Sequence, residues 1–115
     1  MNINDFHLKR YDAHKYNCSH FVRDLWLFLV GTDIADLVGA WNSGNLSESM
    51  AKRSDLIRLN EACGPCIALF QKAGTTPHIG VFIEEKIFHM TPEGPRLQEL
   101  SFVSQQYTNV KFYRC

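Results

Sequence analysis

The second half of the chain carries short apolar runs separated by turn-forming residues, and this pattern limits the fold more than any other feature. Turn residues, mainly Gly, Pro, Thr and Glu, separate the runs, and residues 96–100 have the composition of a further short strand. We therefore expect an antiparallel meander. The four clearest runs are Cys66–Gln71, His78–Ile83, Lys86–Thr91 and residues 110–114.

The first half of the chain has helical patterns instead. Phe21, Leu25 and Phe28 recur at i, i+4 and i+7, which predicts a buried helix. Asn17 is a good N-cap for this helix, and Gly31 is a suitable residue to end it. Helices followed by strands predict an α+β domain, in which N-terminal helices pack on a mainly antiparallel sheet of four to six strands.

Two further segments complete the prediction for the first half. Residues 47–59 are expected to form a second helix, with Ser47 as its N-cap. Residues 39–45, GAWNSGN, have the composition of a loop, in which Trp41 either lines a substrate groove or packs against the core. No internal repeat divides the 115 residues, so we expect one domain over residues 1–115.

Composition excludes several classes of function. Twelve Lys and Arg residues balance twelve Asp and Glu residues, which leaves no basic surface for nucleic acid or for anionic lipid. The longest apolar run, residues 25–30, is too short to span a bilayer, and the first ten residues lack the pattern of a secretion signal. We expect synthesis in the cytoplasm, so a substrate outside the cell would require a delivery route such as a phage particle or a secretion system.

The four cysteines are expected to be mostly reduced thiols, because they are too few for a disulfide scaffold. Cys18 falls in the first turn of the predicted helix, where the helix dipole and free N–H groups meet its sulfur. Such a setting predicts a lowered thiol pKa and a nucleophile at neutral pH. The alternative is that Cys18 is a small buried apolar residue without chemistry.

Two histidines are predicted to lie on one face of a β-hairpin. If Glu84 and Glu85 form a two-residue turn, Ile83 pairs with Lys86, and alternation places His78 and His89 on the same face as diagonal neighbours. A thiol nucleophile needs such a base, and the base needs a polar group that fixes its orientation. The alternative is two unrelated histidines of the sheet.

Taken together, NCSHFV, GPCIALF, PHIGVFIEEKIFHM and GPRLQEL resemble the landmarks of the NlpC-type cysteine peptidases (the NlpC/P-sixty superfamily). These papain-related enzymes cut bacterial cell-wall peptides, and some compact members are associated with phages. The resemblance implies a papain-like NlpC-type fold, no cofactor or metal, and Cys18, His78 and His89 as nucleophile, base and orienting residue. The implied reaction is hydrolysis of an amide in a peptidoglycan stem peptide, typically between D-γ-glutamate and diaminopimelate. Candidate substrate-binding residues are Tyr11, Tyr16, His20 and Trp41, with Tyr11 or Tyr16 as an additional oxyanion donor.

The sequence departs from the family pattern at three places. Asn17 replaces a frequent Asp, His20 replaces a frequent Gly, and Pro65-Cys66 replaces the acidic residue that is common before the central strand. Asn-Cys-x-His-Phe is similar to the lecithin:retinol acyltransferase branch of the superfamily, but there the histidine strand precedes the cysteine helix. An acyltransferase or amidase of that kind remains an alternative.

Three other hypotheses depend on the remaining cysteines or on the absence of catalysis. Cys63 and Cys66 form a CGPC motif, which suggests a redox dithiol. A redox motif of this kind is followed by a helix, whereas here a strand-like run follows it. Cys18, His20, Cys63 and Cys66 have the ligand types of a zinc site. The third hypothesis is an inactive papain-like binding domain.

Overall fold

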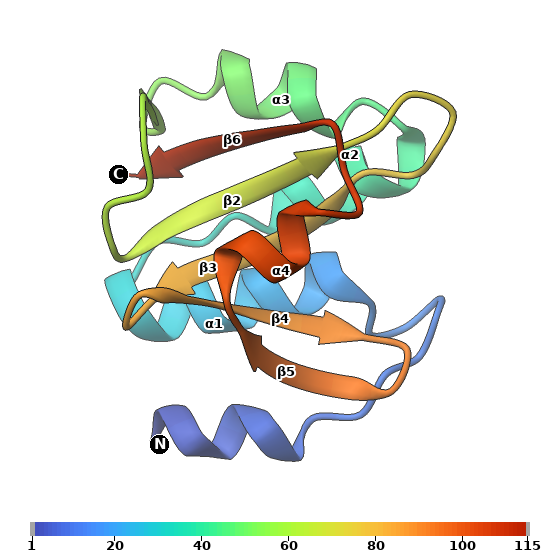
Figure 1. Cartoon of the computed structure of the whole chain (residues 1–115), viewed down its shortest axis with the longest axis vertical. Coiled ribbons are helices and arrows are strands. Elements are labelled where there is room, and N and C mark those ends of the chain that lie inside the picture. The colour runs from blue at the N-terminus through green and yellow to red at the C-terminus, as the bar shows by residue number, and fades with distance from the viewer. Residues whose placement is uncertain (1, 115) are drawn as a thin grey trace.

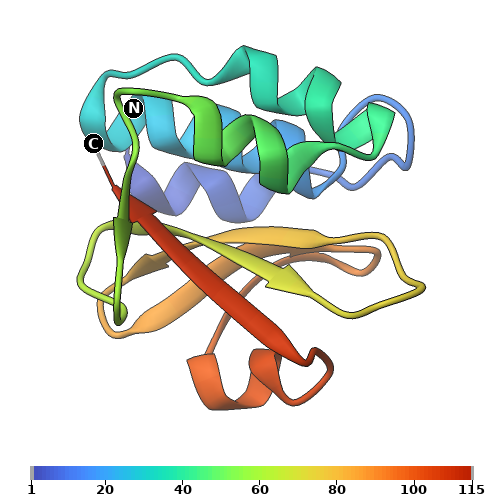
Figure 2. The same ribbon diagram turned by 90° about the horizontal axis from the view of Figure 1, so that it is seen from above.

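Within the described residues 2–114, six strands form an antiparallel sheet with helices on both of its faces (Figure 1, Figure 2). This computed structural model confirms the predicted α+β class, while the predictions for Met1 and Cys115 lie outside the described residues. The elements in chain order are η1 (Ile3–Leu8), α1 (Cys18–Val30), α2 (Ala35–Ser43), α3 (Leu46–Lys52), β1 (Ile57–Leu59), β2 (Cys66–Gln71), β3 (His78–Ile83), β4 (Lys86–Thr91), β5 (Gly94–Gln98), α4 (Leu100–Ser104) and β6 (Asn109–Arg114).

The strand order is β1-β6-β2-β3-β4-β5, and every pair is antiparallel. Strands β2 to β5 form the predicted meander, because each pairs with the next along the chain. The last strand, β6, lies between β1 and β2 instead of at an edge. Strand β3 therefore lies between β2 and β4, and His78 at its start is paired with Phe70 of β2.

Helix α1 begins and ends where the sequence predicts. The side chain of Asn17 caps its first turn, and Gly31 ends it with a φ of 77°, a left-handed conformation that suits glycine. The helix packs on β3 and β4. The predicted apolar face is wrong in one detail: Phe28 is 39 % exposed, and Trp26, which is buried, contributes to the core instead.

The prediction of one helix over residues 47–59 is wrong. Helix α3 begins after Asn45, ends before Arg53, and is followed by strand β1. The Arg53 guanidinium forms ion pairs with Asp36 of α2 and with Asp55, which stabilises the chain as it leaves the helix. Strand β1 then pairs with β6, so tertiary pairing overrides the local helical pattern.

The prediction of a loop around Trp41 is also wrong, because most of residues 39–45 belong to α2. The glycine and asparagine residues that suggested a loop mark the end of the helix, where Gly44 has a φ of 79°. The indole Nε1 of Trp41 donates a hydrogen bond of 2.8 Å to the carbonyl of Pro77. Helix α2 thus holds the segment that leads into His78.

The two faces of the sheet carry separate apolar clusters. Helix α1 and its neighbours cover the face that presents Ile79, Val81 and Phe88. Helix α4, which was not predicted, lies on the opposite face (Figure 2). Because side chains alternate along a strand, His78 and His89 lie on the α4 face, whereas the cluster that contains Cys18 lies on the α1 face.

The β3–β4 hairpin has the predicted register, with Ile83 paired to Lys86. Its two turn residues, Glu84 and Glu85, have φ values of 53° and 65°. Two positive φ values are typical of a type I′ turn, which favours Asn-Gly and strains residues with larger side chains. The hairpin that carries both histidines is therefore closed by an unfavourable pair.

Replacing this pair with the preferred residues should stabilise the protein. We expect Glu84→Asn combined with Glu85→Gly to raise the free energy of unfolding by about 1 kcal/mol, because the strain of two positive φ values is relieved. Urea unfolding followed by circular dichroism measures the change. The matched control, Glu84→Gln with Glu85→Gln, removes the charges but keeps the strain. An equal gain in the control would show that charge repulsion, and not backbone strain, is the cause.

Candidate active site

Cys18 is the first residue of α1, and the capping interactions around it fix the start of the helix. The Oδ1 atom of Asn17 accepts hydrogen bonds from the backbone N–H and the hydroxyl of Ser19. The backbone N–H of Asn17 donates to Nδ1 of His20 at 3.1 Å, which completes a capping box. The Nδ2 amide of Asn17 donates to the carbonyl of Ala13. The sulfur of Cys18 is thus presented by a rigid first turn.

The Cys18 thiol does not have the predicted low pKa. Burial raises the pKa of Cys18 to about 11, although the backbone N–H groups of Ile79, Ser19 and Cys18 itself favour the thiolate. The residue is 5 % exposed, and three amide donors do not replace the solvation that a thiolate loses there. The prediction from the helix dipole is therefore wrong, and the resting sulfur is a neutral thiol.

His78 and His89 are in direct contact, which confirms that they are neighbours on one face of the hairpin. Nε2 of His78 and Nδ1 of His89 are 2.7 Å apart. Gly80 makes this approach possible, because a Cβ atom there would lie 3.0 Å from Cβ of His89 and 2.9 Å from the side chain of Ile87. The pair continues to Gln98 of β5, whose Oε1 lies 2.7 Å from Nε2 of His89.

This chain of hydrogen bonds selects the tautomers of both rings. An amide oxygen can only accept, so the contact with Gln98 requires a proton on Nε2 of His89. The bare Nδ1 of His89 then accepts from Nε2 of His78. Nδ1 of His78 consequently carries no proton and is the nitrogen available as a base.

Both imidazoles are neutral at physiological pH. Burial lowers the pKa of His78 to about 3, and the neighbouring His89 adds to the shift. Burial is also the main cause that lowers the pKa of His89, partly opposed by the hydrogen bond to Gln98. A neutral thiol thus shares the site with a neutral imidazole pair.

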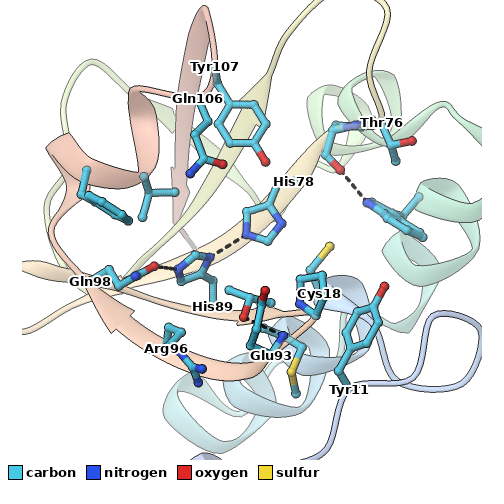
Figure 3. A pocket seen from close by; sticks show the side chains of 17 residues that line it. Tyr11, Cys18, Thr76, His78, His89, Glu93, Arg96, Gln98, Gln106 and Tyr107 are labelled. Atoms are coloured by element: carbon cyan, nitrogen blue, oxygen red, sulfur yellow. Dashed lines mark hydrogen bonds between the residues drawn. The ribbon is translucent and has the colours of Figure 1, made fainter.

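These groups meet in a cleft of about 580 Å³ at the end of the sheet where β3 begins. Cys18, His78 and His89 all line it, together with residues of α4 and of the chain that follows α4. Figure 3 shows the sulfur of Cys18 and the His89 ring on opposite sides of the His78 ring. The nucleophile candidate and the base candidate therefore share one accessible space.

The four residues predicted to bind substrate fall into two groups. Tyr11 and Trp41 line the cleft. Tyr16 does not, because its hydroxyl donates to the carboxylate of Asp24 at 2.7 Å, and burial together with this bond raises its pKa. His20 does not line the cleft either, and its Nδ1 accepts a hydrogen bond from the backbone N–H of Asn17. Of the two tyrosines considered as oxyanion donors, Tyr11 is the one in the cleft.

Two residues of the site were missed by sequence reasoning. Gln98 is a diagonal neighbour of His89 across the β4–β5 ladder, so an exact register for β5 would have identified it. Tyr107 follows α4, and its ring stacks on the ring of His78 with centroids 6.1 Å apart and an interplanar angle of 8°. No local pattern in the sequence brings Tyr107 to β3, since the contact depends on the unpredicted α4.

Cys63 and Cys66 do not line this cleft. Cys63 is exposed and Cys66 is buried, and both are free thiols. Among the described residues, no group of three or more His, Cys, Asp or Glu side chains is arranged to hold a metal ion. Cys18, His20, Cys63 and Cys66 are thus not brought together as the zinc hypothesis requires.

Comparison with known protein families found no matching family model, and comparison with curated proteins found no match. None of the described helices combines the length and the apolar character that crossing a bilayer requires.

Proposed function

We propose that the protein is a cysteine peptidase that hydrolyses an amide bond in peptidoglycan stem peptides. The observation that carries the proposal is the hydrogen-bonded chain from Gln98 through His89 to His78, which leaves Nδ1 of His78 as a base in the cleft that Cys18 lines. A nucleophile, a base and an orienting group in one accessible space are the components of covalent acyl transfer.

The resting protonation states define how the first step proceeds. Because the pKa of Cys18 is raised and that of His78 is lowered, the proton moves from the sulfur to Nδ1 of His78 as the sulfur attacks the carbonyl. The tetrahedral oxyanion accepts a hydrogen bond from the backbone N–H of Cys18. The backbone N–H of Ser19 is not used for this, because it already donates to Oδ1 of Asn17. His78 then donates its proton to the leaving amine, and water hydrolyses the acyl-enzyme.

The substrate class is inferred from the resemblance to NlpC-type peptidases, and the architecture supports it. A cysteine begins a helix that packs on an antiparallel sheet, and the histidine follows on a central strand that forms a hairpin with the strand of the second histidine. This arrangement supports our proposal that the domain has a papain-like NlpC-type fold. The expected scissile bond links D-γ-glutamate to diaminopimelate.

Product analysis tests the proposal most directly. Purified protein is incubated with soluble stem-peptide fragments of peptidoglycan, and the products are identified by mass spectrometry. We expect one new amino terminus on diaminopimelate and one new γ-carboxylate on glutamate, and neither with Cys18→Ala. Intact fragments after prolonged incubation would contradict the proposal, and binding of intact fragments would then favour a non-catalytic domain.

Tyr107 is expected to support the reaction through its ring. Tyr107→Leu should lower kcat several-fold to about tenfold with little change in KM, because the stacked ring holds the plane of His78. Steady-state kinetics on a stem-peptide substrate separates the two parameters. Tyr107→Phe is the matched control and should retain activity, since it keeps the ring. An equal loss in Tyr107→Phe would assign the role to the hydroxyl instead.

A further inference from the structure

Arg96 is held directly beside the paired imidazoles. In the β4–β5 ladder it is the partner of His89, so the two side chains lie on the same face of the sheet. Arg96 also lines the cleft, and Figure 3 shows it next to His89. Its guanidinium is therefore placed by strand register at the edge of the reaction centre.

The charge of Arg96 is not neutralised by the described part of the chain. Its Nη1 donates to the carbonyl of Pro95 at 2.9 Å, and no ion pair of residues 2–114 includes it. Glu93, the other residue of the cleft with a charged side chain, does not form an ion pair with Arg96. The charge also disfavours protonation of His89, so it opposes the positive charge that develops on the imidazoles during catalysis.

We infer that Arg96 binds a carboxylate of the substrate that lies next to the scissile amide. This inference rests on the proposed function and names the chemical class that the cleft selects. A guanidinium binds a carboxylate through two parallel hydrogen bonds, which fixes position as well as charge. In a γ-linked glutamate the α-carboxylate is free and belongs to the residue that supplies the acyl group. Such a carboxylate would neutralise Arg96 when the substrate is bound.

Two synthetic stem peptides that differ in one group provide the test. One carries the free α-carboxylate on its γ-linked D-glutamate, and the other carries a neutral α-carboxamide. We expect wild-type protein to cleave the carboxylate peptide with a kcat/KM at least about tenfold higher. Arg96→Gln should reduce this ratio to about one, and Arg96→Lys should retain part of it, because lysine keeps the charge but lacks the planar fork. Arg58→Gln, on strand β1 at the opposite edge of the sheet, is the matched control and should keep the wild-type ratio.

The outcomes separate this inference from the proposed function. Equal cleavage of both peptides by wild-type protein overturns the carboxylate site and leaves the peptidase proposal standing. A uniform loss on both peptides in Arg96→Gln also overturns it, because Arg96 would then act through His89. If neither peptide is cleaved, calorimetric titration of Cys18→Ala with each peptide decides. If Cys18→Ala binds the carboxylate peptide more tightly than the carboxamide peptide, and the double variant with Arg96→Gln does not, the carboxylate site is supported while the peptidase proposal fails. If Cys18→Ala binds both peptides equally, or binds neither, both proposals are overturned.

Discussion

Cys18→Ala and His78→Ala are each expected to lower kcat/KM on stem peptides by at least about 10⁴-fold. Alanine at position 18 removes the attacking sulfur, and alanine at position 78 removes the base that must take the thiol proton. Since the two groups act as a unit, the double variant should be no worse than either single variant. Initial rates measured over a wide range of enzyme concentration give the three values.

Two matched variants make this result specific. Cys63→Ser changes an exposed thiol outside the cleft and should keep wild-type activity. Gln98→Leu removes the acceptor that selects the tautomers of both imidazoles, so it should cause a smaller loss than His78→Ala. Circular dichroism checks that each variant is folded. Appreciable cleavage by folded Cys18→Ala would refute a covalent mechanism through this sulfur.

The second large effect is a loss of stability in acid. The pKa of His78 is about 3 in the folded protein, against an ordinary value of 6.5, so the unfolded chain binds a proton in this interval and the folded protein does not. The stability due to the neutral imidazole is therefore fully present above pH 6.5 and is lost as the pH falls toward 3. Between these two pKa values we expect His78 to lower the free energy of unfolding by about 1.4 kcal/mol for each pH unit of acidification.

Urea unfolding at a series of pH values between 7 and 4 measures this dependence. His89, whose pKa is also lowered, should add to the slope. His78→Gln is the comparison, since glutamine does not titrate and retains a polar group near His89. The stability of His78→Gln should depend on pH less steeply, because roughly one proton fewer is taken up on unfolding. Parallel curves for the wild type and His78→Gln would mean that His78 is protonated normally in the folded protein.

The features that sequence reasoning predicted correctly are those that depend on neighbouring residues. The N-cap at Asn17 and the left-handed Gly31 are decided within one turn of α1. Contact between His78 and His89 follows from strand alternation and a two-residue turn, both of which are local. The strands of the meander were predicted for the same reason.

The features that the sequence did not reveal depend on distant parts of the chain. The pKa of Cys18 is governed by burial beneath β3, which outweighs the local effect of the helix start. Gln98 and Tyr107 join the site only through the β5 register and the position of α4. Trp41 was assigned to a loop, whereas its hydrogen bond to Pro77 connects α2 to the start of β3.

The separate clusters on the two faces of the sheet have a mechanistic consequence. Cys18 belongs to the helical layer on one face, and the imidazole pair stands on the other. The sulfur of Cys18 and the imidazole of His78 therefore approach each other at the start of β3. Their alignment depends on the packing of α1 against the sheet. A small displacement of α1 relative to the sheet would separate the thiol from its base and abolish catalysis while the strands remain paired.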